Sequence, residues 1–386
     1  MALIPPDNDM AVMASLLAIA GGAFVLERTR LGGQLTATVI AIVGAMAAAN
    51  LQLIPHAAPA YGFVFTYIVP VLIPLFLFQA DLRRILFEST RTTAAFLLAS
   101  AATVAGVTAA ALILDLGGLA PAASTPPALR EPAIAGLFAA TYIGGSVNYA
   151  ALGEITGLSR DASFFSAATA TDNLFGAAYL AVLALLPGWR WLGRQFKAHD
   201  QTPAGGDASL LPITAMSLTL ALALATVMVA LADALVAWLE LPGWRYIVIT
   251  TAALLFATLA PRAAQRLAGS FELGVCLSLL FFATIAAGAD VAAMIRVAPV
   301  LVAMVSIVLV VHALITLLVG RWLGLSLPEL ITASNAAVLG ATTAPALAAA
   351  KGWNNLVTPG VLVGVFGYAL GTYLGTLIYR CWGAIL

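Results

Sequence analysis

Residues Thr141-Tyr-Ile-Gly-Gly-Ser-Val-Asn148 interrupt an otherwise apolar segment, 134–156, with glycine, serine and asparagine. A second stretch, Gly340-Ala-Thr-Thr-Ala-Pro345, interrupts the apolar segment 329–350 in the same manner. Gly and Pro weaken helices, and hydroxyl and amide side chains can satisfy the backbone groups that are freed. Matched interruptions in two halves of a membrane chain point to a transport site, whereas helix packing through small residues is the alternative explanation. We predict two broken helices that cross near the bilayer midplane.

The composition around these stretches places the chain in a lipid bilayer. Of 386 residues, 62% are hydrophobic and 9% are charged, against about 25% charged in soluble proteins. Lys and Arg (17) balance Asp and Glu (17), so there is no basic field for nucleic acid. Cys276 and Cys381 lie in apolar runs and form no metal or disulfide motif, and the first residues carry no basic signal-peptide region.

Twelve apolar runs are candidates for membrane spans, since a span needs about 20 apolar residues. The sequence predicts an all-α membrane protein with about 11–13 transmembrane helices. The longest polar stretch, 188–209, divides the chain into a first repeat at 1–187 and a second at 210–386. The apolar runs are 10–27, 35–54, 62–80, 92–116, 134–156, 162–187, 211–239, 246–260, 271–289, 297–323, 329–350 and 356–380.

The two halves resemble each other. Residues 145–157 align without gaps on 340–352, a shift of 195 residues, and Asp81 aligns on Asp290 at a shift of 209. The difference is about the length of the loop at 117–132 in the first half. We interpret the chain as a duplicated fold.

The basic residues favour an inverted second half with the central loop 188–209 in the cytoplasm. This arrangement places twelve of the 17 Lys and Arg inside, whereas twelve simple crossings give no bias. Six spans per half would make the repeats parallel, so one segment must be re-entrant or miscounted. The twelve are Arg28, Arg30, Arg83, Arg84, Arg91, Arg190, Arg194, Lys197, Arg262, Arg266, Arg321 and Arg380.

Asp172 lies mid-span directly after the first interruption. A carboxylate at membrane depth costs about 2.5–3.5 kcal/mol, so it should face a partner or a wet cavity. Neutral oxygens around it would suit Na⁺, and a buried carboxylate could exchange a proton for a cation. We predict that the coupling-ion site comprises Asn148, Thr171, Asp172, Asn173, Asn335, Thr342 and Thr343, with Na⁺ at Asp172, Asn148 and Thr343. The predicted substrate-lining residues are Gly144, Gly145, Ser146, Ser334, Gly340 and Pro345.

The other embedded polar residues have simpler explanations. Asp81 and Asp290 lie beside arginines at span ends, and Asp233 and Glu154 lie near interfaces. His312 lies in a long apolar helix, where a hydrogen-bonded structural role is favoured over a proton relay.

The interrupted segments, together with Ala170-Thr-Asp-Asn173 and the closing Gly367-Tyr-Ala-Leu-Gly-Thr-Tyr-Leu-Gly375, resemble the YjcL-like family of integral membrane proteins. That family is grouped with the cation:proton antiporter and bile-acid-symporter-like superfamily. The resemblance implies an NhaA-type inverted repeat, with a panel domain for homodimer contacts and a core domain with two crossed broken helices. It also implies an acidic site after the first broken helix, where Asp172 and Asn173 stand. Several antiporters of the superfamily carry a basic residue on the last core helix, and Gly367-Tyr368 stands there instead.

The sequence can be compared with four classes of function. An ion-coupled (Na⁺ or H⁺) secondary transporter of a small organic solute in the cytoplasmic (inner) membrane is favoured, and a monovalent cation/proton antiporter is the alternative. An enzyme is disfavoured because the chain has no Ser/His/Asp order and no metal-ligand spacing. A channel is disfavoured because nothing marks a filter. We expect no cofactor other than the coupling ion.

Overall fold

The computed structural model describes residues 2–29, 37–199, 212–241, 244–289 and 291–385, and these are helical apart from one isolated β-bridge and the connecting turns. The helices of the first half are α1 (Asp9–Glu27), α2 (Ala37–Asn50), α3 (Pro59–Phe63), the π-helix η2 (Val64–Ile68), α4 (Val69–Leu77), α5 (Leu82–Glu88), α6 (Thr90–Ile113), α7 (Arg130–Gly144), α8 (Ser146–Thr156) and α9 (Ala162–Leu185). After α10 (Arg190–Gly193) follow α11 (Ala215–Trp238), α12 (Arg245–Leu259), α13 (Pro261–Gln265), α14 (Ser270–Ala287), α15 (Val291–Trp322), α16 (Leu327–Leu339), α17 (Thr343–Ala350) and α18 (Val357–Ile385).

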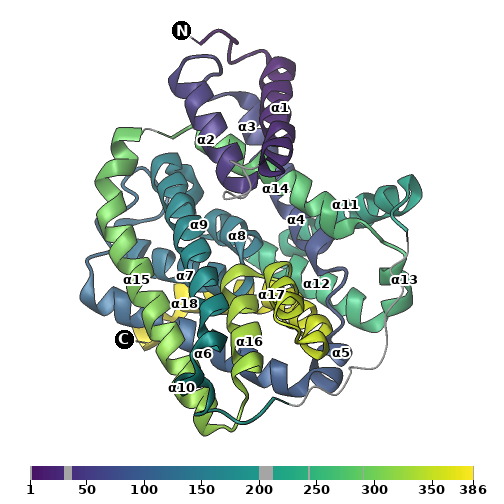
Figure 1. Cartoon of the computed structure of the whole chain (residues 1–386). Helices are drawn as coiled ribbons and strands as arrows, with labels where there is room; N and C mark the ends of the chain where they lie inside the picture. Colours follow the sequence, from purple (N-terminus) through teal and green to yellow (C-terminus); the bar gives the residue numbers. More distant parts are fainter. Residues whose placement is uncertain (1, 30–36, 200–211, 242–243, 290, 386) are drawn as a thin grey trace.

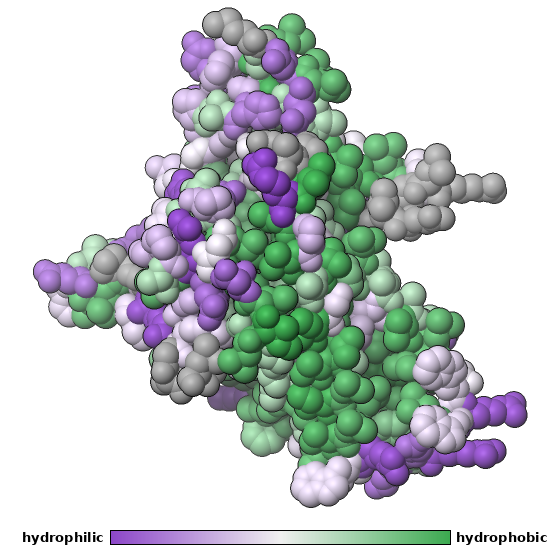
Figure 2. All heavy atoms as spheres, turned by 90° about the vertical axis from the view of Figure 1, so that its left-hand side faces the viewer, coloured by the Kyte–Doolittle hydropathy of each residue, from purple (hydrophilic) through white to green (hydrophobic). Residues whose placement is uncertain are grey.

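The all-helical membrane class predicted from the sequence is confirmed. Within the described residues, eight helical stretches are long and apolar enough to cross a bilayer, and α2 and α12 are shorter apolar helices. Together these ten are fewer than the 11–13 spans predicted, because two of the twelve apolar runs fold back on themselves. Figure 2 shows the apolar character of one face, where a broad hydrophobic surface has hydrophilic side chains gathered toward its edges.

Several helix boundaries of the two halves coincide at the shifts found in the sequence. At the shift of 209, the end of α6 at Ile113 falls on the end of α15 at Trp322, and α2 falls on α12. At the shift of 195, the start of α9 at Ala162 falls on the start of α18 at Val357. The two interruptions fall on each other as well, at Gly145 and Gly340.

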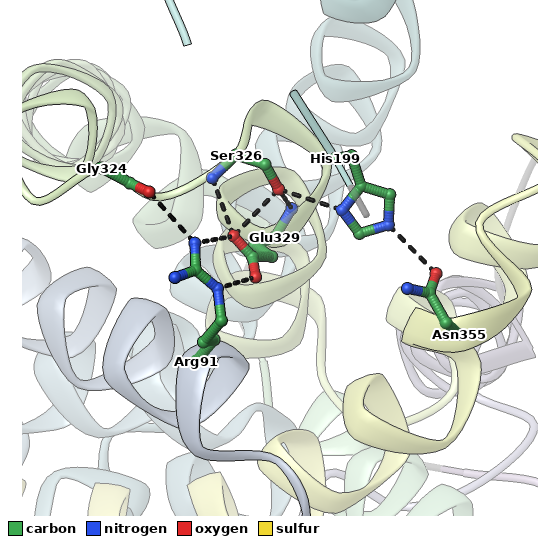
Figure 3. A network of polar contacts seen from close by, with 6 residues as sticks. All are labelled: Arg91, His199, Gly324, Ser326, Glu329 and Asn355. Carbon is green, nitrogen blue, oxygen red and sulfur yellow. Dashed lines mark hydrogen bonds and ion pairs between the residues drawn. The ribbon is translucent and has the colours of Figure 1, made fainter. Parts of the chain in front are cut away.

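Each interrupted segment forms a helical hairpin. We call α7–α8 hairpin 1 and α16–α17 hairpin 2. The base of hairpin 1 is closed by Thr125, just before α7, whose hydroxyl donates to the carbonyl of Thr156 at the end of α8 (2.6 Å). The base of hairpin 2 is closed by His199, whose ring contacts both Ser326 before α16 (3.1 Å) and Asn355 after α17 (3.0 Å) (Figure 3).

This geometry corrects the sequence interpretation. Helix breaks are present at both places, but the chain does not continue across as a crossed broken helix. It turns back, so that both ends of each hairpin lie at the same end of the molecule. The physical reason lies in the bases: the loop before α7 and the central linker each hydrogen-bond to the far leg.

The two hairpins enter from opposite ends and meet at their tips beside the middle of α18. Glycines on α18 allow this close approach, since a Cβ on Gly364 would lie 2.4 Å from the Ala341 Cα at the tip of hairpin 2. Further along α18 the contacts pass to hairpin 1. In order along α18, the glycines and their neighbours are Gly360 with Thr332, Gly364 with Ala341, Gly367 with Ile143 and Gly375 with Gly136.

The first helices of each half form one layer and the last ones another. In Figure 1, α1, α2, α4, α11, α12 and α14 gather at the top and right, and we call them the scaffold. The hairpins pack with α6, α9, α15 and α18 in the left and lower part, which we call the core. Aromatic contacts join the two layers, including Phe76 of α4 with Tyr368 of α18 and Phe165 of α9 with Phe281 of α14.

One basic residue lies at the end opposite to that predicted. Trp382, two residues after Arg380, donates to Glu131 in the first turn of hairpin 1 (3.0 Å), so Arg380 lies with the base of hairpin 1. Lys351, at the base of hairpin 2, takes its place on the linker side. We call the end of the molecule where the central linker lies the linker end. Since one basic residue leaves this end and another joins it, the excess of basic residues there is unchanged.

Candidate functional site

The turn of each hairpin depends on one glycine. Gly145 has φ 75° and ψ −163°, and Gly340 has φ 94° and ψ −170°, a conformation that is open essentially only to glycine. Open space surrounds the position of a Cβ on Gly145, and only the Tyr368 hydroxyl lies near that of Gly340, at 3.7 Å. The glycines are therefore required by the backbone and not by crowding. Gly144, in contrast, is crowded: a Cβ there would lie 2.2 Å from the Asn148 Oδ1.

Both second legs begin at the tips without a side-chain cap. The N-cap residues of α8 and α17 are Gly145 and Thr342, and neither makes a capping hydrogen bond. Ser146 and Thr342 are exposed although they lie at the tips in the interior of the fold. The first N–H groups of these helices thus give partial positive charge to the region beside these two exposed side chains.

Asp172 is the charged residue of the tip region. It lies on α9 at the position that corresponds to Gly367 of α18, the residue that packs against the tip of hairpin 1. Its carboxylate is partly buried and interacts with the phenol of Tyr142 on α7, although that hydroxyl has no partner at hydrogen-bond distance. Tyr149 of α8 is also within electrostatic reach. No described Lys, Arg or His forms an ion pair with Asp172.

The neighbours of Asp172 in sequence are engaged along α9 itself. The Thr171 hydroxyl donates to the Ala167 carbonyl (2.9 Å), and the Asn173 amide donates to the Thr169 carbonyl (2.8 Å). Successive residues of a helix point about 100° apart, so three in a row cannot all face one ion. The structure therefore favours Asp172 over Thr171 and Asn173 as the residue directed at hairpin 1.

Asn148 joins hairpin 1 to α18. Its Nδ2 donates to the Tyr368 carbonyl (2.6 Å) and to the Thr372 hydroxyl (2.8 Å), and its Oδ1 is buried without a protein partner. The hydroxyls of Thr141 and Ser166 are likewise buried without a protein partner. Hairpin 1 and α9 thus carry several buried oxygens whose hydrogen-bonding capacity the described protein groups leave unused.

The predicted residues of hairpin 2 are placed differently. Asn335 and Thr343 bond to each other across the tip, with the Thr343 hydroxyl donating to Asn335 Oδ1 (2.8 Å) and the Asn335 amide donating to the Thr343 carbonyl (3.2 Å). Pro345 packs near Gly360 of α18. These residues hold the turn of hairpin 2 closed, a role that the sequence analysis did not assign to them.

Ser334 belongs to a buried chain of hydrogen bonds below the tip of hairpin 2. Its hydroxyl contacts Tyr179 on α9 (2.7 Å) and the Nε2 of His312 on α15 (2.8 Å). The Nδ1 of His312 contacts the Thr103 hydroxyl on α6 (2.9 Å). His312 is thereby satisfied on both ring nitrogens, in agreement with a structural role. Tyr179 and Ser334 also line a cavity of about 150 Å³ that is otherwise mainly apolar.

Of the other acidic residues that the sequence analysis named, the three that the structure describes make local hydrogen bonds or ion pairs. Asp81 caps α5 by accepting from the backbone N–H of Arg83 (2.9 Å). Glu154 accepts from the Ser159 hydroxyl (2.5 Å), and Asp233 pairs with Arg245 (2.5 Å). Asp290 lies outside the described residues.

Sequence reasoning missed the aromatic members of the site. Tyr142 interacts with Asp172, and Tyr149 lies within electrostatic reach of it while its hydroxyl donates to the Phe165 carbonyl (2.6 Å). The Tyr368 carbonyl accepts from Asn148. Both tyrosines of hairpin 1 stand within the quoted stretch or directly after it, but a tyrosine in a membrane helix is equally typical of packing. Their position three and four residues from the turn was the signal available.

Comparison with known proteins agrees with the family resemblance. Residues 14–382 match the family described as "Protein of unknown function (DUF819)". The chain is 32% identical over 403 aligned positions to the "Uncharacterized membrane protein YjcL" of Bacillus subtilis (strain 168), with 98% of each chain covered. The match includes both hairpins and the helices that bear the site. The chain therefore belongs to the DUF819 family of membrane proteins.

Proposed function

We propose that this protein is an ion-coupled secondary transporter of a small organic solute and not an enzyme. The observation that carries the proposal is the meeting of two oppositely directed hairpins beside Asp172. Non-helical backbone at membrane depth occurs where it lines a cavity or is buried in protein, and half-helix ends there are the usual ligands of transported solutes.

The charge at the tips indicates the class of solute. The segments that form the site, 141–149, 169–176, 335–346 and 364–372, contain Asp172 as their one charged residue. The uncapped N-termini of α8 and α17 offer N–H groups to an anion, and the exposed Ser146 and Thr342 hydroxyls lie beside them. We propose a small carboxylate, with Gly144, Gly145, Ser146 and Gly340 bringing the backbone close to it.

The coupling ion would bind on the side of hairpin 1. Asp172 supplies the compensating charge for Na⁺, or the group that takes up H⁺, and the unpartnered Asn148 Oδ1 supplies a neutral oxygen. Thr343 remains a further candidate ligand from hairpin 2, although its hydroxyl donates to Asn335.

An asymmetry between the hairpins supports alternating access. The second leg of hairpin 1, α8, packs against α4 of the scaffold, whereas the principal partners of α17 are α16 and α18 of the core. Ala346 of α17 is exposed, while the corresponding residue of α8, Ala151, is buried. We propose that this state is open along α17 toward the linker end, and that the opposite state uncovers α8.

The basic residues support a cytoplasmic position for the linker end. Eleven described Lys and Arg lie at that end and five at the other, as the positive-inside rule requires of cytoplasmic loops. We propose that the protein resides in the cytoplasmic membrane in this orientation, and homodimer formation stays a prediction. The five are Arg130, Arg160, Arg245, Arg296 and Arg380, and the eleven are Arg28, Arg83, Arg84, Arg91, Arg190, Arg194, Lys197, Arg262, Arg266, Arg321 and Lys351.

A monovalent cation/proton antiporter is the second candidate. It is favoured by the same Asp172 and its buried oxygens, because an antiporter needs an ion site and no site for an organic solute. The uncapped N-termini of α8 and α17 favour the solute transporter, because their N–H groups can bind an anion and cannot bind a cation.

Thermal unfolding of the purified protein tests these functions. We expect Na⁺ or acidic pH to raise the melting temperature through Asp172, and one class of carboxylate to raise it further by mass action. Asp172→Asn should remove the ion response, and Asp233→Asn, which removes a carboxylate far from the site, should retain it. A response to cations with none to a broad panel of carboxylates would favour the antiporter. No response to either would contradict both.

A further inference from the structure

The base of hairpin 2 contains a polar network that the proposed transport site does not use (Figure 3). Glu329, in the first turn of α16, accepts from the Arg91 guanidinium through two bonds (2.6 and 3.0 Å). It also accepts from the backbone N–H (2.8 Å) and the hydroxyl (2.9 Å) of Ser326. The carboxylate of Glu329 is thus held by α6 on one side and by its own capping box on the other.

His199 of the central linker completes this network. Its Nδ1 lies 3.1 Å from the Ser326 hydroxyl oxygen, and its Nε2 lies 3.0 Å from the Oδ1 of Asn355. Ser326 starts hairpin 2 and Asn355 follows its end. The linker is fixed there by a backbone bridge between Lys197 and Ser326 and by a bond from Arg321 to Gln195 (2.6 Å).

Both ring nitrogens of His199 lie against oxygen atoms, and which of them donates depends on the protonation of the ring. A bond to Asn355 Oδ1 needs a hydrogen on Nε2. While the Ser326 hydroxyl donates its one hydrogen to Glu329, a bond between Ser326 and Nδ1 needs a hydrogen on Nδ1 as well. A neutral imidazole carries one N–H, and only the imidazolium carries two. Neutral His199 would have to give up one of these three bonds.

We propose that His199 is a proton-binding site whose protonated form latches the two legs of hairpin 2 to the central linker. Imidazole changes its charge between pH 5 and 8, so the latch would tighten when the linker side is acidified. The effect on transport rests on the function proposed above, whereas the proton site itself does not.

The charges around His199 act in both directions. Glu329 of α16 favours the imidazolium through the shared Ser326 hydroxyl, and Arg91 of α6 partly offsets that charge. The other charged residues on the described elements around it are basic: Arg190, Arg194 and Lys197 in the linker, Arg321 at the end of α15 and Lys351 after α17.

Nitrogen NMR of the full-length protein with ¹⁵N-labelled histidine tests the proposal. The chain has three histidines, at 56, 199 and 312, and His199→Gln identifies the signal of interest. We expect two ring protons on His199 at pH 6. At pH 7, the ratio of doubly to singly protonated ring should fall about three- to tenfold in Asn355→Leu, which removes the Nε2 acceptor. Asn354→Leu is the matched control, because Asn354 is the exposed neighbour and should change nothing.

A second variant keeps the test decisive if Asn355→Leu does not fold. Asn355→Asp strengthens the acceptor and should raise the doubly protonated fraction instead. Hydrogen exchange in 343–356, corrected for the intrinsic effect of pH, should be slower at pH 6 than at pH 8 in the wild type and not in His199→Gln. A singly protonated His199 at pH 6 would overturn the proposal, as would equal behaviour of the Asn355 and Asn354 variants.

Discussion

The two turn glycines give the sharpest test of the hairpins. At Gly145 and Gly340 the backbone has φ of 75° and 94° with ψ near 180°, where a residue with a Cβ carries a strain of about 1–3 kcal/mol. No atom lies within 3.4 Å of the place that a Cβ would take at either glycine, so substitution by alanine adds strain and no clash. Alanine also loses less entropy on folding, which returns about 0.4–1 kcal/mol. We expect Gly145→Ala and Gly340→Ala each to destabilise the protein by about 1–2 kcal/mol, a five- to thirtyfold change in the folded-to-unfolded ratio.

The control is Gly21→Ala, in the middle of α1, where the space for a Cβ is equally open and the backbone is helical. Alanine is favoured over glycine in a helix by about 1 kcal/mol, so this variant should be unchanged or more stable. Unfolding in denaturing detergent, followed by tryptophan fluorescence, measures all three. If the turn variants behave like Gly21→Ala, the chain does not depend on glycine to turn back, and the description of the hairpins is wrong.

Three further predictions follow from the site and the hairpin bases. Asp172→Asn should abolish ion-coupled transport in proteoliposomes and leave a folded protein, because Asn keeps the shape but cannot change charge; normal coupling would make Asp172 structural. In a background without Cys276 and Cys381, Ala346→Cys should react with a hydrophilic thiol reagent at least tenfold faster than Ala151→Cys, and equal rates would argue against the open path along α17. At the base of hairpin 2, outside the spanning helices, burial alone would raise the pKa of Glu329, but its bonds to Arg91 and Ser326 hold the pKa below its usual range. The resulting stability is present above the pKa of the unfolded state and is lost as pH falls through the lowered value, so Glu329→Gln should weaken the loss of stability below about pH 4.5, as unfolding curves from pH 3 to 7 would show.

The helix breaks could be predicted because glycine within an apolar run is visible in the sequence. The direction that the chain takes after each break could not be predicted. Gly145 permits a turn, but the chain turns back because Thr125 bonds to Thr156, residues that the sequence shows only as members of two separate segments. The same holds for hairpin 2, which is closed by His199 of the central linker, a residue far from the hairpin in the sequence.

The distribution of basic residues and the number of apolar runs gave opposite predictions for the second half, and the hairpins explain why. Basic residues favoured an inverted second half, and six crossings per half excluded it. Hairpins that start and end on one side leave five crossing segments in each half, an odd number, and the conflict disappears. For the candidate site, the sequence singles out Asp172 because a lone carboxylate in an apolar helix is rare. The ligand role predicted for Asn335 and Thr343 could not be separated from turn closure, since both roles use the same oxygens.

The hydrogen bond between Thr103 and His312 bears on how the two repeats have diverged from each other. These two residues correspond at the shift of 209, so at this point each repeat touches its own counterpart across the axis that relates them. In an ancestor with identical halves, a single residue type would have faced itself there. In the present protein the two residues differ. A chain of hydrogen bonds runs from His312 through Ser334 to Tyr179. The residues that correspond to Ser334 and Tyr179 in the other repeat are apolar, Ala139 and Leu374. If the protein alternates between two openings, as proposed above, two identical halves would populate both equally, and a polar chain on one side alone would favour one of them.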